Sequence, residues 1–175
     1  MARRLVTTIN ITLDGFVDHD AVIADAEHHD YVTELLEKAE MVVLGRNTHD
    51  LFQKYWPEIA ESQSATPAEN AFARKLESLV RVVVSTTKSG GVDLAEVARL
   101  RGTDGGDMLV MGSPTLTRSL LDAKLVDECH FCIQPMLLGQ GRTFPHTEAK
   151  RRIDFAHDET ETLRSGVTIV RYRAR

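Results

Sequence analysis

Short apolar runs alternate with amphipathic segments along the first 124 residues. The runs are rich in β-branched and other apolar residues, which is typical of buried strands, and the segments between them repeat apolar residues at helical spacing. In the segment 26–40, for example, Tyr31, Val32, Leu35, Leu36 and Ala39 fall on one helix face. The pattern predicts strands over 4–13, 41–45, 81–87 and 107–112, helices over 26–40, from residue 46, over 67–78, 93–101 and 113–124, and a surface loop over 61–67.

The pattern changes after residue 124. Three strand-like runs, 125–137, 151–161 and 166–175, follow one another without a helix between them. Strands joined by helices pair in parallel, whereas strands joined by short connections pair antiparallel. We therefore expect an α/β fold with a mostly parallel central sheet and antiparallel C-terminal strands. The chain shows neither an internal repeat nor a linker, so residues 1–175 are predicted to form a single domain.

Composition and charge narrow the class of protein. The 175-residue chain is 42% hydrophobic and 27% charged, with a formal net charge of −5 and a pI near 5.8. This acidic balance argues against general binding to nucleic acid or to an anionic membrane surface. No apolar run reaches the ~20 residues of a membrane span, and the start "MARRLVTTIN" lacks an apolar stretch of signal-peptide length. We expect a cytoplasmic protein.

Two groups of residues raise the question of a metal or redox site. Cys129 and Cys132 form a single C-x-x-C beside His130, which would suit a redox pair or half of a zinc site. The alternative is a buried strand, because residues three apart on a strand point to opposite faces. We favour the strand, since the chain has no second cysteine pair. Histidines at 19, 28 and 29 include no helical i, i+4 pair, so we expect no metal.

Polar residues follow three of the predicted strands at their carboxyl ends. The three segments are Gly45-Arg46-Asn47-Thr48, Ser85-Thr86-Thr87 and Gly112-Ser113-Pro114-Thr115. In an open α/β sheet, ligands bind outside the carboxyl ends of the strands, where loops and helix N-termini meet. We therefore expect these segments to lie close together.

The chemistry of these segments suits a phosphate-bearing ligand. Helix N-termini present unpaired N–H groups, and glycine lets the backbone approach a ligand closely. Arg46 can form bidentate hydrogen bonds to a phosphate, and the serine and threonine hydroxyls can donate further bonds. The alternative is local: Thr48 and Ser113 cap helices, and Ser85–Thr87 only turn the chain. The recurrence on three strands favours a ligand.

The sequence resembles the dihydrofolate-reductase-like family, in the branch that includes the reductase domain of bifunctional riboflavin-biosynthesis deaminase-reductases. The matching segments are "ITLDGFV", "VVLGRNTHDLF", "VVVSTT", "MLVMGSPTLTRSLLDAKLVDE" and "IQPMLLGQGRTF", which together cover nearly the whole chain. The resemblance implies a three-layer α-β-α sandwich that binds NADPH across the strand ends.

The resemblance also implies roles for single residues. Arg46 corresponds to the family residue that contacts the 2′-phosphate of NADPH, and Thr48 corresponds to a diphosphate contact. The adenosine side would be lined by Ser85, Thr86 and Thr87, and the diphosphate and nicotinamide ribose would be held by Gly112, Ser113, Pro114, Thr115 and Leu116, with Gly45 and Asn47 beside them. Folate reductases have Gly-Gly joined by a cis peptide where this chain has Gly112-Ser113, so the geometry of that bond is left open.

On the substrate side, the resemblance points to the loop that carries Asp14 and Phe16, to the helix near residue 30, and to Trp56. Folate reductases use an acidic residue on that helix, and Asp30 is the candidate. It lies opposite the apolar face, however, and an acidic residue in the first turn is equally explained by the positive end of the helix dipole. Asp14-Gly15 is equally a common turn pair, and Trp56 would equally pack under a loop. The tryptophan and proline that precede this helix in folate reductases are missing, which argues against a true folate reductase.

The sequence therefore predicts an NADPH-dependent reductase of a small, heterocyclic substrate. One alternative is a 5-amino-6-(5-phosphoribosylamino)uracil reductase of riboflavin biosynthesis, against which stands the lack of a second basic cluster for the substrate phosphate. Another is a nucleotide-binding protein without catalysis. A homodimer is expected, because relatives in the riboflavin branch pair through the C-terminal half.

Overall fold

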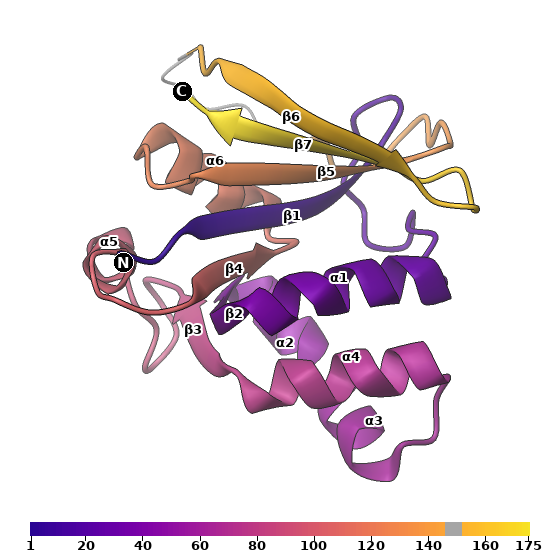
Figure 1. The fold of residues 1–175 in the computed structure, drawn as a ribbon, viewed down its shortest axis with the longest axis horizontal. Coiled ribbons are helices and arrows are strands. Elements are labelled where there is room, and N and C mark those ends of the chain that lie inside the picture. Colours follow the sequence, from indigo (N-terminus) through magenta and orange to yellow (C-terminus); the bar gives the residue numbers. More distant parts are fainter. Residues whose placement is uncertain (146–151) are drawn as a thin grey trace.

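The computed structural model describes residues 1–145 and 152–175, which fold around one seven-stranded sheet (Figure 1). The strand order is β3-β2-β4-β1-β5-β7-β6. All strands from β1 to β5 pair in parallel, and β7 pairs antiparallel with both β5 and β6. The strands are β1 (Leu5–Thr12), β2 (Ala39–Gly45), β3 (Val80–Val84), β4 (Asp107–Met111), β5 (Glu128–Gln134), β6 (Phe155–Thr162) and β7 (Thr168–Ala174).

Helices cover both faces of the sheet, so the predicted α/β sandwich with antiparallel C-terminal strands is confirmed. One core joins α1 and α4 to the sheet, and a second core joins α5 and α6 to the opposite face. Alternating residues of β2 pack in the two cores: Val42 and Leu44 in the first, and Val43 in the second. The helices are α1 (Ala26–Lys38), α2 (Arg46–Phe52), α3 (Trp56–Ser62), α4 (Pro67–Ser78), α5 (Leu94–Arg101) and α6 (Pro114–Asp122).

Local chemistry explains which helices the sequence predicted well. The α4 helix starts with a capping box, in which Thr66 and Glu69 exchange hydrogen bonds, and with Pro67 in its first turn. The α3 helix was not predicted. Its N-cap residue, Tyr55, makes no side-chain cap bond. The helix extends to Ser62, so the surface loop predicted over 61–67 begins only after that residue.

The C-x-x-C segment lies within β5, as the strand interpretation predicted. Cys129 packs in the core beside α5 and α6, whereas Cys132 packs in the core beside α1. The two thiols therefore face opposite sides of the sheet. The predicted strand over 151–161 is observed from Phe155, and Arg151 lies outside the described residues. No helix in the described ranges has the length and apolar character needed to cross a membrane.

Candidate functional site

A cavity of about 580 Å³ opens at the carboxyl ends of β1 and β4, between α1, α2 and the loop that follows β1. Its walls differ in chemistry. One side is polar and consists of the predicted strand ends, and the other is aromatic and carries two histidines. The lining residues that matter below are Asn10, His28, His29, Asn47, Thr48, Trp56, Phe72, Gly112, Ser113, Pro114 and Arg142.

The ends of β2 and β4 are joined directly at the polar wall. The buried Ser113 hydroxyl accepts a hydrogen bond from the Gly45 N–H at 2.9 Å and donates one to Thr48 Oγ1 at 2.8 Å. A Cβ atom on Gly45 would lie 3.2 Å from Ser113 Oγ, so this approach favours glycine. Ser113 stands at the N-cap position of α6 but makes no cap hydrogen bond with its side chain. Its hydroxyl therefore holds two loops together.

The turn after β4 adopts a left-handed backbone. Gly112 has φ +55°, and Ser113, which is not a glycine, has φ 46°. L-residues rarely occupy this region, and such strain is often found at ligand sites. The Gly112–Ser113 peptide is trans, which settles the question left open by the Gly-Gly resemblance.

The predicted cofactor residues divide into two sets. Asn47, Thr48, Gly112, Ser113 and Pro114 line the cavity. The others lie around it: Gly45 lies beside Ser113 and Leu116, and the exposed Thr115 hydroxyl accepts a hydrogen bond from Arg142 at 2.6 Å.

The end of β3 is engaged in its own turn. Ser85 Oγ accepts hydrogen bonds from the N–H groups of Thr87 and Lys88, as the local interpretation expected. Thr87 is nevertheless connected to the neighbouring strand end, because Arg46 Nη1 donates to its hydroxyl at 2.8 Å. Thr86 is exposed and does not line the cavity. The Arg46 guanidinium is exposed and forms no ion pair with a described carboxylate.

Arg142 was not predicted as a site residue. The loop that follows β5 returns to the cavity, where the Arg142 N–H donates to Asp18 and its carbonyl accepts from the Val17 N–H. The side chain lines the cavity and reaches Thr115 at the start of α6. The glycines of "LGQGR" were the only sequence signal for this turn, and they gave no indication of where the arginine points.

The aromatic wall surrounds Trp56, as the substrate-side prediction placed it. The Trp56 ring lies 4.5 Å from Phe72 and 5.9 Å from His29 in edge-on arrangements. Both the pocket and the packing interpretations of Trp56 therefore hold, since the ring lines the cavity while it packs on α4. Such a wall suits a flat, apolar ring.

His28 and His29 occupy the place on α1 where an acid was expected. Both side chains are 7% exposed and line the cavity. Burial, with a smaller contribution from His29, lowers the pKa of His28 to about 4, so this imidazole is neutral near pH 7. Asp30 is exposed and is absent from the cavity lining, because the 100° rotation per residue turns it away from the sheet. Its exposed position agrees with the helical register of the sequence analysis, and a catalytic role for Asp30 stays a prediction.

Asp14 and Phe16 shape the loop and do not line the cavity. The Asp14 carboxylate accepts hydrogen bonds from Thr12 Oγ1 at 2.6 Å and from the N–H groups of Leu138 and Gly139. These bonds, the Thr12 bond first, lower the pKa of Asp14. The Phe16 backbone bridges to Thr143. Both residues thus have a structural role in the loop, and their contact with a substrate stays a prediction.

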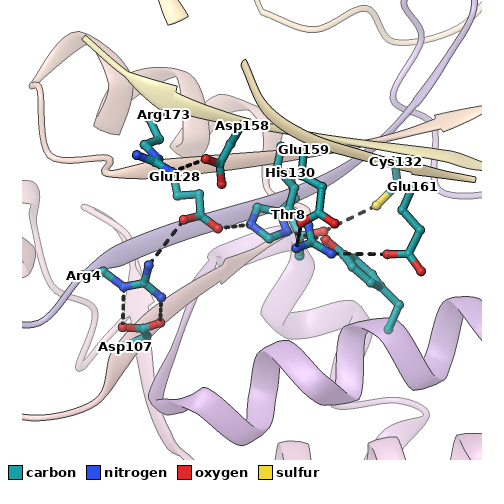
Figure 2. Close-up of polar contacts among 12 residues, drawn as sticks. Arg4, Thr8, Asp107, Glu128, His130, Cys132, Asp158, Glu159, Glu161 and Arg173 are labelled. Carbon is teal, nitrogen blue, oxygen red and sulfur yellow. Dashed lines mark hydrogen bonds and ion pairs between the residues drawn. The ribbon is translucent and has the colours of Figure 1, made fainter. Parts of the chain in front are cut away.

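A second polar cluster lines a separate space beside β1, β4 and β5. Figure 2 shows a chain of contacts from Asp107 through Arg4 and Glu128 to His130, whose Nε2 lies 2.5 Å from Glu128 Oε1. The Tyr31 hydroxyl is hydrogen-bonded to His130 Nδ1. The space beside this cluster is only about 60 Å³, which is too small for a substrate. Within the described ranges, no group of three or more His, Cys, Asp or Glu side chains is placed to bind a metal.

Comparisons with known proteins agree with this fold. The family model described as RibD C-terminal domain matches residues 89–169. The uncharacterized protein YyaP of Bacillus subtilis (strain 168) is 27% identical over 185 residues, which cover 97% of this chain and 94% of that protein.

Two solved structures are similar over the whole chain. A putative riboflavin biosynthesis protein from Shewanella sp. PV-4 has a TM-score of 0.68 at 20% identity, covering 100% of this chain and 99% of that chain. Dihydrofolate reductase from Enterococcus faecalis, complexed with NADP(H) and RAB-propyl, has a TM-score of 0.61 at 11% identity, covering 100% and 99%. The chain therefore has the dihydrofolate-reductase-like fold and is similar to the RibD C-terminal domain over residues 89–169.

Proposed function

We propose that the protein is an NADPH-dependent reductase of a small heterocyclic substrate, working in the cytoplasm without a nucleic-acid or membrane partner. The observation that carries this proposal is the cavity of about 580 Å³ with two unlike walls. The joined ends of β2 and β4 form its polar wall, and Trp56, Phe72 and the two histidines form the other. The oxidoreductase families that the chain resembles support the proposal.

The residues of the polar wall fit a dinucleotide. Gly112, with φ +55°, lets the main chain turn at the wall where a diphosphate would lie, and Gly45 lets the end of β2 approach Ser113 closely. The first-turn N–H groups of α6, at Thr115 and Leu116, have no acceptor within the helix and favour an anion. Arg46 supplies an exposed guanidinium for the 2′-phosphate, and Arg142 supplies a second cation at the opposite side of the diphosphate wall.

When bound, NADPH supplies the hydride, and the chain supplies binding, orientation and exclusion of water. Thr48, Asn47 and Ser113 would hold the polar end, and the Trp56 wall would hold the ring of the substrate against it. The adjoining apolar side chains, such as Val32 and Phe52, limit the access of water to that ring.

A second candidate is a 5-amino-6-(5-phosphoribosylamino)uracil reductase. The match to the RibD C-terminal domain favours it. Against it stood the lack of a second basic group for the substrate phosphate, and Arg142 is such a group in the cavity lining. A third possibility, a nucleotide-binding protein without catalysis, is an outcome of the test below.

The test is a pair of titrations followed by a substrate panel. NADPH and NADH are titrated separately into the purified chain, with the fluorescence of the reduced nicotinamide as the readout. NADPH oxidation is then followed with the aminouracil substrate and with other heterocycles. Saturable NADPH binding and turnover are expected. Failure to bind NADPH would refute the proposal, and binding without turnover across the panel would favour the non-catalytic protein.

A further inference from the structure

Two imidazole nitrogens in the cavity have no partner in the described structure. They are Nδ1 of His28 and Nε2 of His29, the nitrogens that remain after the recorded hydrogen bonds are assigned. In the described residues, the fully buried side-chain atoms that lack a hydrogen-bond partner are His49 Nδ1, Ser165 Oγ and Arg171 Nε. The two imidazole nitrogens are not in this group. Both therefore retain contact with open space, and the open space beside these two side chains is the cavity.

The tautomer of His28 is fixed by a chain of hydrogen bonds that starts at a backbone donor. The Ile23 N–H donates to Gln134 Oε1 at 2.9 Å, which orients the buried Gln134 amide with its nitrogen toward Asn10. Gln134 Nε2 then donates to Asn10 Oδ1 at 3.0 Å, so this oxygen is an acceptor. His28 Nε2 lies 3.0 Å from the same oxygen and must donate to it. The neutral ring therefore carries its lone pair on Nδ1.

A carbonyl oxygen fixes His29 in the same way. His29 Nδ1 lies 3.0 Å from the main-chain oxygen of Asp25, which only accepts, so Nδ1 carries the proton. With the proton on Nδ1, the lone pair is on Nε2, while Trp56 and Phe72 hold the orientation of the ring through edge contacts.

We propose that His28 and His29 determine substrate specificity as a pair of hydrogen-bond acceptors, held in fixed tautomers by Asn10, Gln134 and the Asp25 carbonyl. They select a neutral ring that donates N–H bonds, such as a cyclic amide, and they disfavour an amidinium cation. Asn10 and Gln134 act as positioning residues through His28. This inference rests on the proposed function, because it concerns the ring that lies in the same cavity.

The charges around the cavity agree with this selection. An amidinium ion is recognised best by a carboxylate that accepts two parallel bonds, and the α1 wall offers two imidazoles instead. Of the two aspartates in the lining, Asp18 accepts from the Arg142 N–H, and Asp20 is exposed in the loop after β1.

The test uses two probes of nearly the same shape, benzamide, which is neutral, and benzamidine, which is cationic near pH 7. Each is titrated into the chain labelled with ¹⁵N-histidine, and the ring nitrogens are followed by NMR. Benzamide should shift His28 Nδ1 and His29 Nε2 and bind about tenfold more tightly than benzamidine. Equal or reversed affinities would overturn the proposal, as would the absence of benzamide binding at millimolar concentration.

Two variants and a control sharpen the result. His29→Glu places a carboxylate in the wall and should reverse the preference toward benzamidine. Asn10→Asp keeps the shape but favours a protonated His28, so His28 Nδ1 should show the chemical shift of an N–H donor and benzamide affinity should fall about tenfold. Asp30→Asn changes an exposed carboxylate on the same helix and should leave both affinities unchanged. An Asn10→Asp spectrum and affinity equal to wild type would overturn the positioning role.

NADPH binding is measured on every variant to separate the two proposals. If NADPH binds and benzamide does not, the acceptor pair is refuted while the reductase proposal stands. If benzamide binds as expected and NADPH does not, the reductase proposal fails, and the acceptor pair still describes how this cavity binds rings.

Discussion

Ser113 Oγ lies 2.9 Å from the main-chain nitrogen of Gly45, although 67 residues separate them along the chain. The same hydroxyl donates to Thr48. One buried side chain thus ties the start of α6 to the end of β2, so the polar wall of the cavity is held in place before any ligand enters it.

Replacing Ser113 with alanine should weaken both stability and cofactor binding. The Gly45 N–H would lose its acceptor, which costs about 1–3 kcal/mol at a buried site, and NADPH affinity should fall by about tenfold. Urea unfolding and NADPH titration measure the two effects. Ser119→Ala, which removes only a bond to a helix carbonyl, is the control. Unchanged NADPH affinity in Ser113→Ala would separate this hydroxyl from the cofactor site.

Arg46→Ala should affect NADPH and leave NADH nearly unchanged. Only the 2′-phosphate distinguishes the two cofactors, and a charge-assisted contact to it contributes about 1.5–3 kcal/mol, or about ten- to a hundredfold in affinity. Lys88, which already pairs with Asp50 at 2.6 Å, is the nearest competitor for the phosphate. Parallel titrations of both cofactors decide the matter, with Lys54→Ala as an exposed control. Equal losses for both would show that Arg46 supports the Thr87 turn instead.

Stability should fall as the pH is lowered from about 6.5 to about 4, and His28 should account for part of the loss. Its pKa is lowered in the folded chain, so the unfolded chain binds the proton first and gains free energy in this window. The shift from 6.5 to about 4 corresponds to at most about 3 kcal/mol. His28→Gln should flatten the profile in urea unfolding at several pH values, and the exposed His157→Gln should not. A His28→Gln profile as steep as wild type would assign the loss to other groups.

Alanine at Cys129 or Cys132 should leave NADPH affinity intact. Both thiols are buried, and burial raises the pKa of each to about 11, so neither is a reactive thiolate near pH 7. The loss of core packing should cost about 1–3 kcal/mol. Thiol labelling of the native chain should be slow and should accelerate on unfolding. Stoichiometric zinc in the purified protein would contradict this assignment.

We expect a homodimer, as the resemblance to the riboflavin branch implied. β6 is an edge strand, and an uncovered edge favours association. Light scattering at micromolar concentration should give twice the chain mass of 19.5 kDa. A monomeric mass would count against the prediction.

The pattern of the sequence was sufficient for the sheet, because strand and helix periods differ and because polar segments mark the strand ends. It was insufficient for α3, since this seven-residue helix has Pro57 in its first turn but no side-chain cap before it. The sequence also did not show that His28 and His29 line the cavity. Which α1 residues reach it depends on the helix rotation relative to the sheet, and that rotation is set by tertiary packing.

The roles of Asn10, Gln134 and Arg142 could not be predicted at all. Each takes its function from a partner more than 20 residues away, and neither an amide on a strand nor an arginine in a glycine-rich turn indicates its partner. By contrast, the position of Ser113 and Thr48 at the cavity could be predicted because the chemistry of a strand end is local, while their contact with a cofactor stays a prediction.

The Asp14 carboxylate, which is bonded to the N–H groups of Leu138 and Gly139, makes the two loops at the rim one mechanical unit. To widen the entrance of the cavity, protein engineers would therefore have to change the loops after β1 and after β5 together. A graft of the loop after β1 from a relative would lose its anchor unless the loop after β5 were transplanted with it. Libraries that vary both segments together should yield more folded variants than libraries that vary either one alone.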